Sequence, residues 1–250
     1  PKVAFFELSS CEGCQLQLAN LGEELLELLG LIELVEFREI MSEKWAGRLD
    51  LAFVEGSVVD AESEQRLKEI RARSDLLVGY GSCATLGGIN GMKNLRPLTE
   101  AQAMVYTDKD DWFPAAATRA IDQVVKVDYL IHGCPIFPPE LLKVLKAALA
   151  GLPYAVPDFA VCVECRFNEN ICLYDKGVTC LGPVTRAGCN AWCINAGNIC
   201  YGCRGLVSNP NSCGAEDVLR RYDLDARQIA DKMTMYNACK GLESKVINDE

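Results

Sequence analysis

Eight cysteines lie between residues 162 and 203, close enough together in sequence to share a common partner. They are Cys162, Cys165, Cys172, Cys180, Cys189, Cys193, Cys200 and Cys203. Disulfides, structural zinc sites and iron–sulfur clusters all gather thiols in this way, and eight thiols make the two complete sets of four that either metal alternative requires. The spacing of Cys162-x-x-Cys165 and Cys200-x-x-Cys203 is also that of zinc knuckles, so this stretch alone leaves zinc and iron–sulfur both open.

The composition limits the cellular compartment and the kinds of binding partner that we expect. The chain has 250 residues, half of them hydrophobic, which suffices for one substantial core and an appendage. A net charge of −10 and a pI of about 4.8 argue against a nucleic-acid partner. No apolar run reaches the length of a membrane span, nothing at the N-terminus resembles a secretory signal, and internal Arg220-Arg221 is not a twin-arginine export signal. We therefore expect a cytoplasmic protein, where disulfides are disfavoured.

Short apolar runs alternate with helical patterns along the first 151 residues. The expected strands are residues 3–8, 32–37, 51–54, 76–78 and 129–131. The expected helices are residues 16–29, 60–73, 114–123 and 139–149, with a further one at 226–239 in the tail. The alternation predicts an α/β, flavodoxin-like domain: a parallel sheet with helices on both faces. Gly151, Pro153 and Pro157 mark its end, so we expect domains at 1–151 and 152–250, the second small and loop-rich.

Four more cysteines follow the carboxyl ends of predicted strands. Cys11 and Cys14 come after the first strand, Cys83 after the fourth and Cys134 after the fifth. Parallel sheets hold their ligands outside the carboxyl ends of the strands, so these thiols are expected to converge on one site.

The loop after the fourth strand also fits a dinucleotide-binding fingerprint, which is an alternative to a metal site. Gly79, Gly81 and Ala84 fit G-x-G-x-x-A, and Glu100 lies about twenty residues further on. The fingerprint belongs to the first strand of a Rossmann unit, and Cys83 would be a poor neighbour for a pyrophosphate. We expect these glycines instead to let the backbone approach a metal cluster closely.

Three motifs in the first half resemble the proximal-cluster half of the small, electron-transferring subunit of nickel–iron hydrogenases. They are Cys11-x-x-Cys14, Gly81-Ser82-Cys83 and Gly133-Cys134-Pro135. The second half is similar to the same family: the run from Cys172-Leu173 through Cys180 and Gly182-Pro183 to Cys189 resembles its path through the distal cluster, and residues 192–203 resemble its medial signature. The resemblance covers residues 1 to about 207.

The resemblance implies three 4Fe-4S clusters, each held by four cysteines. The implied proximal ligands are Cys11, Cys14, Cys83 and Cys134, the distal ligands Cys162, Cys165, Cys172 and Cys180, and the medial ligands Cys189, Cys193, Cys200 and Cys203. Many members of the family have histidine at the position of Cys162, and proline at that of Cys193, which leaves a three-iron medial cluster. Thiolates at both positions imply three all-cysteine clusters of low potential, suited to exchange with NAD(P)H, a deazaflavin or ferredoxin.

The resemblance also implies partner subunits. A large subunit would carry the nickel–iron centre that splits dihydrogen, and further iron–sulfur and flavin subunits would bind NAD(P), as in the multimeric cytoplasmic hydrogenases that can also reduce sulfur. Deazaflavin-reducing and heterodisulfide-reductase-linked hydrogenases are near alternatives. A complex I-like quinone reductase subunit shares only the proximal half, and a zinc-stapled scaffold would leave the four early cysteines unexplained.

Several polar residues remain outside these sets. Clusters move single electrons without breaking substrate bonds, and we find no catalytic constellation of acid, base and nucleophile. His132, the only histidine, is expected to be structural or to support Cys134. Glu12 and Glu55 are expected to cap backbone or face a partner, with proton transfer as the alternative, and Cys213 and Cys239 to be buried or free thiols.

Overall fold

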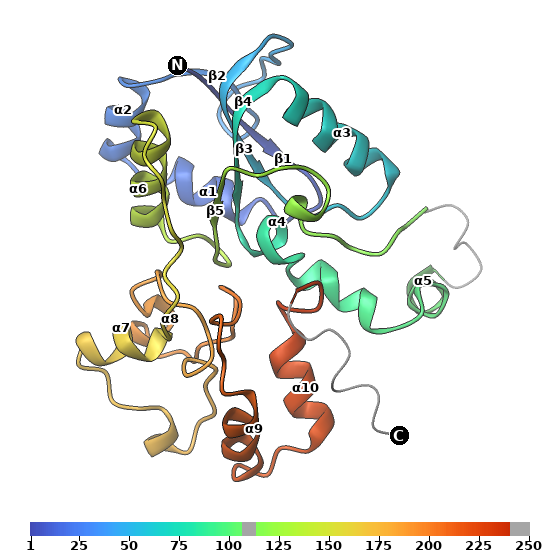
Figure 1. The fold of residues 1–250 in the computed structure, drawn as a ribbon, viewed down its shortest axis with the longest axis vertical. Helices are drawn as coiled ribbons and strands as arrows, with labels where there is room; N and C mark the ends of the chain where they lie inside the picture. The colour runs from blue at the N-terminus through green and yellow to red at the C-terminus, as the bar shows by residue number, and fades with distance from the viewer. Residues whose placement is uncertain (107–113, 241–250) are drawn as a thin grey trace.

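The structure is a computed structural model that describes residues 1–106 and 114–240. Its centre is a five-stranded sheet in which every pairing is parallel and the strand order is β2-β1-β3-β4-β5 (Figure 1). The strands are β1 (Lys2–Glu7), β2 (Glu33–Phe37), β3 (Leu49–Glu55), β4 (Ser74–Tyr80) and β5 (Tyr129–Ile131). This is the flavodoxin-like order that the alternating pattern predicted.

Helices cover both faces of the sheet. The first half contains α1 (Gly13–Ala19), α2 (Glu23–Leu29), α3 (Ala61–Ala72), α4 (Ser82–Leu86), α5 (Leu98–Tyr106) and α6 (Pro138–Leu149). Successive residues of β1 point to opposite faces: Phe5 packs in one core with residues of α1, α2 and α6, and Phe6 packs in the other with residues of α3 and α4. Burial on both faces explains why the strands read as short continuous apolar runs.

The second half is built from short helices and loops, and residues 152–240 contain no β-strand. Its helices are α7 (Val161–Phe167), α8 (Trp192–Asn195), α9 (Ser212–Arg220) and α10 (Ala226–Thr234). In Figure 1 it lies below the sheet, on the side of α4 and the end of β5. The Ser82 hydroxyl, at the start of α4, donates a hydrogen bond to the carbonyl of Cys203, so the two halves are in contact. The division at residue 151 stays a prediction.

Two expected helices are wrong. The leucine pattern of residues 16–29 forms two helices rather than one, because Gly22 between α1 and α2 has a φ of 64° that ends the helical path. In the segment 114–123 only Ile121–Gln123 is helical, as a single 3-10 turn. The backbone groups before this turn form hydrogen bonds with residues 58–59 and are not available to a helix. The Ala116 N–H donates to the carbonyl of Val59, and Arg119 and Val58 form a β-bridge.

The remaining elements agree more closely with the pattern. Helices α3 and α6 lie where they were expected, and the Asp60 carboxylate begins α3 by accepting a hydrogen bond from the Ser63 backbone. The tail helix α10 begins at the expected residue and ends at Thr234 rather than at residue 239. No helix in the described part of the chain is long and apolar enough to cross a membrane.

Candidate metal centres

The four early cysteines lie together at the carboxyl edge of the sheet. Cys11 is in the loop after β1, Cys14 in α1, Cys83 in α4 and Cys134 after β5. Burial is the main cause that raises the pKa of the Cys83 thiol to about 12, and thiolates at Cys134 and Cys11 would add to it. Each of these thiols is thus within the electrostatic reach of others in the set, as the positions after the strands predicted.

Two glycines let the backbone pass directly beside these sulfurs. A Cβ atom on Gly81 would lie 2.6 Å from the Sγ atom of Cys14, and one on Gly88 would lie 2.9 Å from that of Cys83. Both glycines have positive φ, 85° and 57°. Of the glycines in the predicted fingerprint, Gly81 thus lies beside a sulfur, whereas a Cβ on Gly79 would meet Ile121 and Leu130 instead. The approach of this loop to a cluster stays a prediction.

Glu55 caps the helix that carries Cys14. Its buried carboxylate accepts hydrogen bonds from the backbone of Cys14 (3.4 Å) and Gln15 (3.1 Å), at the N-terminus of α1. Burial raises the pKa of Glu55 to about 7 against the lowering effect of these two bonds. Glu12 instead forms an ion pair with Arg38 at 3.3 Å. The contacts of Glu55 match the capping role, whereas the Glu12 side chain makes no capping hydrogen bond to α1. The proton-transfer alternative stays untested.

The second set of thiols gathers around α7. Cys162 and Cys165 lie one turn apart on this helix, and Cys172 and Cys180 follow in the loops beyond it. Burial raises the pKa of Cys162 to about 11, and thiolates at Cys180, Cys165 and Cys172 would raise it further. A Cβ on Gly182 would lie 3.2 Å from the sulfur of Cys162 and 3.5 Å from that of Cys180. Cys162, at the position where the resemblance departs from its family, thus lies with the other three.

The third set lies between the other two. Cys189, Cys193, Cys200 and Cys203 all line one cavity, which Cys134 of the first set also lines. The backbone N–H of Cys200 donates a hydrogen bond of 3.3 Å to the sulfur of Cys180 in the second set. The three sets therefore follow one another in space in an order that differs from their order in the sequence.

Each donor set supplies four cysteine thiols, which is the ligand set that a 4Fe-4S cluster takes. Among residues 1–106 and 114–240, no three His, Cys, Asp or Glu side chains are grouped closely enough to hold one metal ion. A zinc site needs four ligands around one ion, whereas each thiolate of a 4Fe-4S cluster binds a different iron. Burial raises the pKa of the Cys200 thiol to about 12, so this thiol stays protonated unless a bound cation stabilises the thiolate.

The residues outside the sets have ordinary structural contacts. The Nδ1 atom of His132 lies 2.7 Å from the hydroxyl of Thr85, and burial lowers the His132 pKa to about 3, so the ring is neutral. Cys213 is exposed on α9. The thiol of Cys239 donates to the carbonyl of Thr118 at 3.2 Å. These contacts agree with the structural interpretation of His132 and with free thiols at Cys213 and Cys239.

Four residues near the thiols had no signal in the sequence. Arg204 is fully buried beside Cys203 and pairs with Glu140 of α6, Glu164 of α7 holds the loop around Cys189, and Tyr236 lines the cavity of the third set. Charged and aromatic residues occur throughout the sequence, so nothing local marks these four. Only their burial and their contacts with distant residues distinguish them.

Comparisons with known proteins identify the family. Residues 11–148 match the family described as NADH ubiquinone oxidoreductase, 20 Kd subunit. The chain belongs to this family. The match ends with α6, so it covers the first cysteine set and none of the residues 162–203.

Two hydrogenase subunits among the relatives match nearly the whole chain. Sulfhydrogenase 2 subunit delta of Pyrococcus furiosus is 36% identical over 236 residues, which cover 94% of this chain and 98% of the relative. A subunit of the F420-non-reducing hydrogenase vhu of Methanocaldococcus jannaschii is 33% identical, covering 94% and 93%. A crystal structure of an NAD+-reducing [NiFe]-hydrogenase in the H2-reduced state matches with a TM-score of 0.56 and 26% identity, covering 62% of this chain and 94% of that chain. Within the family, this chain is a hydrogenase small subunit.

Proposed function

We propose that this chain relays electrons through three 4Fe-4S clusters between the nickel–iron centre of a large-subunit partner and a flavin- and NAD(P)-binding subunit. The observation that carries the proposal is the gathering of twelve cysteines into three neighbouring sets of four. Such clusters, when bound, accept and release single electrons without breaking substrate bonds.

Each set has its own assigned ligands. Cys11, Cys14, Cys83 and Cys134 would hold the proximal cluster, Cys189, Cys193, Cys200 and Cys203 the medial cluster, and Cys162, Cys165, Cys172 and Cys180 the distal cluster. The rest of the chain positions these thiols and buries Cys14, Cys165, Cys180 and Cys200 among them. Glu55 fixes the start of α1 at Cys14, and glycines such as Gly81 admit the backbone beside the sulfurs.

The all-cysteine sets favour low reduction potentials. Cys162 and Cys193 supply thiolates where many members of the family have histidine and proline, so we expect a fourth iron in the medial cluster and none of the three-iron type. Additional thiolate charge disfavours the reduced state and keeps potentials low. Redox-poised electron paramagnetic resonance tests this assignment. A three-iron signal from protein purified without exposure to oxygen would contradict it.

The partners are proposed from the hydrogenase relatives. Oxidation of dihydrogen on the large subunit yields two protons and two electrons, and the electrons reduce NAD(P)+, with one proton, on another subunit. NAD(P) linkage is proposed because a matched structure is an NAD+-reducing hydrogenase. Sulfur reduction is proposed because one relative is a sulfhydrogenase. A cytoplasmic location follows from the same acceptor chemistry.

A second candidate is a hydrogenase that does not use NAD(P). The F420-non-reducing relative, at 33% identity over 94% of this chain, favours it, with a heterodisulfide reductase as the electron acceptor. Assays of the purified complex under dihydrogen with NAD+, NADP+, polysulfide and a heterodisulfide separate the candidates. Reduction of the heterodisulfide with neither nicotinamide reduced would replace the NAD(P)-linked assignment.

Metal content tests the relay itself. The anaerobically purified complex, corrected for its other subunits, should contain about twelve irons and twelve acid-labile sulfides per copy of this chain. Four of each, with zinc making up the remainder, would leave only the proximal site and would restore the zinc-stapled interpretation of residues 162–203. A complex I-like subunit is opposed by the same second half, which its family match does not cover.

A further inference from the structure

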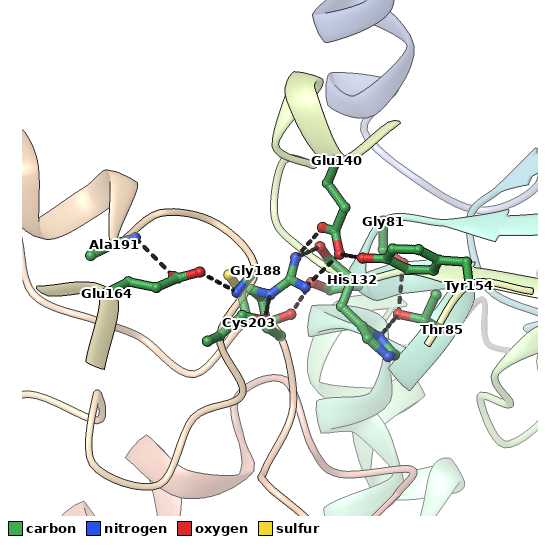
Figure 2. A network of polar contacts seen from close by, with 12 residues as sticks. Gly81, Thr85, His132, Glu140, Tyr154, Glu164, Gly188, Ala191 and Cys203 are labelled. Atoms are coloured by element: carbon green, nitrogen blue, oxygen red, sulfur yellow. Dashed lines mark hydrogen bonds and ion pairs between the residues drawn. The ribbon is translucent and has the colours of Figure 1, made fainter. Parts of the chain in front are cut away.

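Arg204 is a buried cation between the first and third cysteine sets. Its side chain has no exposed surface, although it follows Cys203 in a loop-rich part of the chain. The guanidinium forms two parallel hydrogen bonds to the Glu140 carboxylate of α6, Nη1 to Oε2 at 2.6 Å and Nη2 to Oε1 at 2.8 Å (Figure 2). Such fork-to-fork pairing fixes the orientation of both groups.

The same guanidinium holds two further loops. Nη1 also donates to the carbonyl of His132, two residues before Cys134, and Nε donates at 2.7 Å to the carbonyl of Ala187, two residues before Cys189. One side chain therefore connects a loop of the proximal set with two loops of the medial set. A Cβ on Gly188 would overlap Nη2, so the medial loop passes as close to the arginine as a backbone can.

The contacts continue on both sides of this centre. On α6, the Glu140 carboxylate also accepts a hydrogen bond of 2.5 Å from the hydroxyl of Tyr154. On the other side, the Glu164 carboxylate of α7 accepts from the backbone of Gly188 at 2.8 Å and of Ala191 at 3.1 Å (Figure 2). Glu164 lies between Cys162 and Cys165, so the medial loop is tied to the distal helix as well.

Position, rather than stability, is the property that this pair controls best. Burying two charges costs about as much as their attraction returns, and well-packed apolar residues often replace such pairs without loss of stability. Apolar residues, however, would not hold two backbone carbonyls and the Glu140 carboxylate by directed bonds. The charge also matters: Arg204 lines the same cavity as the four medial cysteines, so its guanidinium lies within electrostatic reach of that set.

We propose that Arg204, balanced by Glu140, is a positioning residue that sets the separation of the proximal and medial clusters and the potential of the medial cluster. The inference rests on the proposed function, because it requires clusters at both sets. A reduced cluster carries one more negative charge than an oxidised cluster, so the guanidinium favours the reduced state and the Glu140 carboxylate opposes it. The two charges thus act in opposite directions on the same potential.

Four variants of the full complex test this assignment: Arg204→Met, Arg204→Lys, Glu140→Gln and the double variant Arg204→Met with Glu140→Gln. We expect the medial potential, from a redox titration followed by paramagnetic resonance, to fall in Arg204→Met and to rise in Glu140→Gln. The double variant should return toward the wild-type potential. Arg204→Lys keeps the charge but loses the paired hydrogen bonds of the guanidinium. The medial potential should therefore stay near wild type, while the magnetic coupling between the proximal and medial clusters changes.

Arg220→Met is the matched control, because Arg220 also pairs with a glutamate, Glu216, but at the surface of α9. It should leave every potential and coupling unchanged. The proposal is overturned if Arg204→Met with full iron content has wild-type medial potential and coupling, or if both charge variants shift the potential in the same direction. Failure of the proposed function is recognised separately, since the wild-type complex itself would then lack iron at the medial set.

Discussion

Replacing Gly81 by alanine tests the fit between backbone and thiol at the proximal set. Gly81 has φ 85° and ψ 153°, a region that residues with a side chain avoid at a cost of about 1–3 kcal/mol. The new Cβ would lie 2.6 Å from the sulfur of Cys14, while ordinary contact begins near 3.4 Å. The difference of about 0.8 Å exceeds the roughly 0.5 Å within which such a site keeps its geometry.

We therefore expect Gly81→Ala to lose the proximal cluster selectively. Iron per chain should fall from about twelve to about eight, and the proximal signal should disappear from redox-poised paramagnetic resonance spectra. Gly22→Ala is the matched control, because Gly22 also has positive φ, 64°, but no atom lies within 4 Å of its added Cβ. It should cost about 1–3 kcal/mol of stability and retain all the iron. Full iron content in Gly81→Ala would refute the reasoning.

Three further predictions concern single positions. Cys193→Pro should lower the iron content from about twelve to about eleven and produce a three-iron signal. Cys193→Ser should not lose the other two clusters. An unchanged iron count in the proline variant would show that Cys193 is not a ligand. Cys213→Ser and Cys239→Ser should each retain about twelve irons, and a loss of four would place that thiol in a cluster. Asp60→Ala removes the cap of α3 and should lower the free energy of unfolding by about 1 kcal/mol, with Asp60→Ser close to wild type in thermal denaturation; equal losses in both would exclude capping as the cause.

Local patterns were sufficient where the structure depends on neighbours in sequence. The strand runs and the helices α3 and α6 follow from the spacing of apolar residues. The helix α7 that carries Cys162 and Cys165 was not predicted. The pattern failed where a distant contact decided the backbone. Residues 114–120 pair with the segment around Val58, and a helical period alone does not reveal that competition.

The sequence by itself determined the kind of chemistry: fourteen cysteines, twelve of them in motifs with the spacing of one family, and strands that carry four of these thiols to one edge. The resemblance implied the order of the sets in space, but only the tertiary structure shows the contacts that produce it: the Cys200 backbone beside the Cys180 sulfur, and Cys134 in the medial cavity. The tertiary structure also decided the pairing of Arg204 with Glu140, which are 64 residues apart. Spacing along the chain fixes only contacts within a turn or two, whereas burial in a common interior brings distant charges and thiols together.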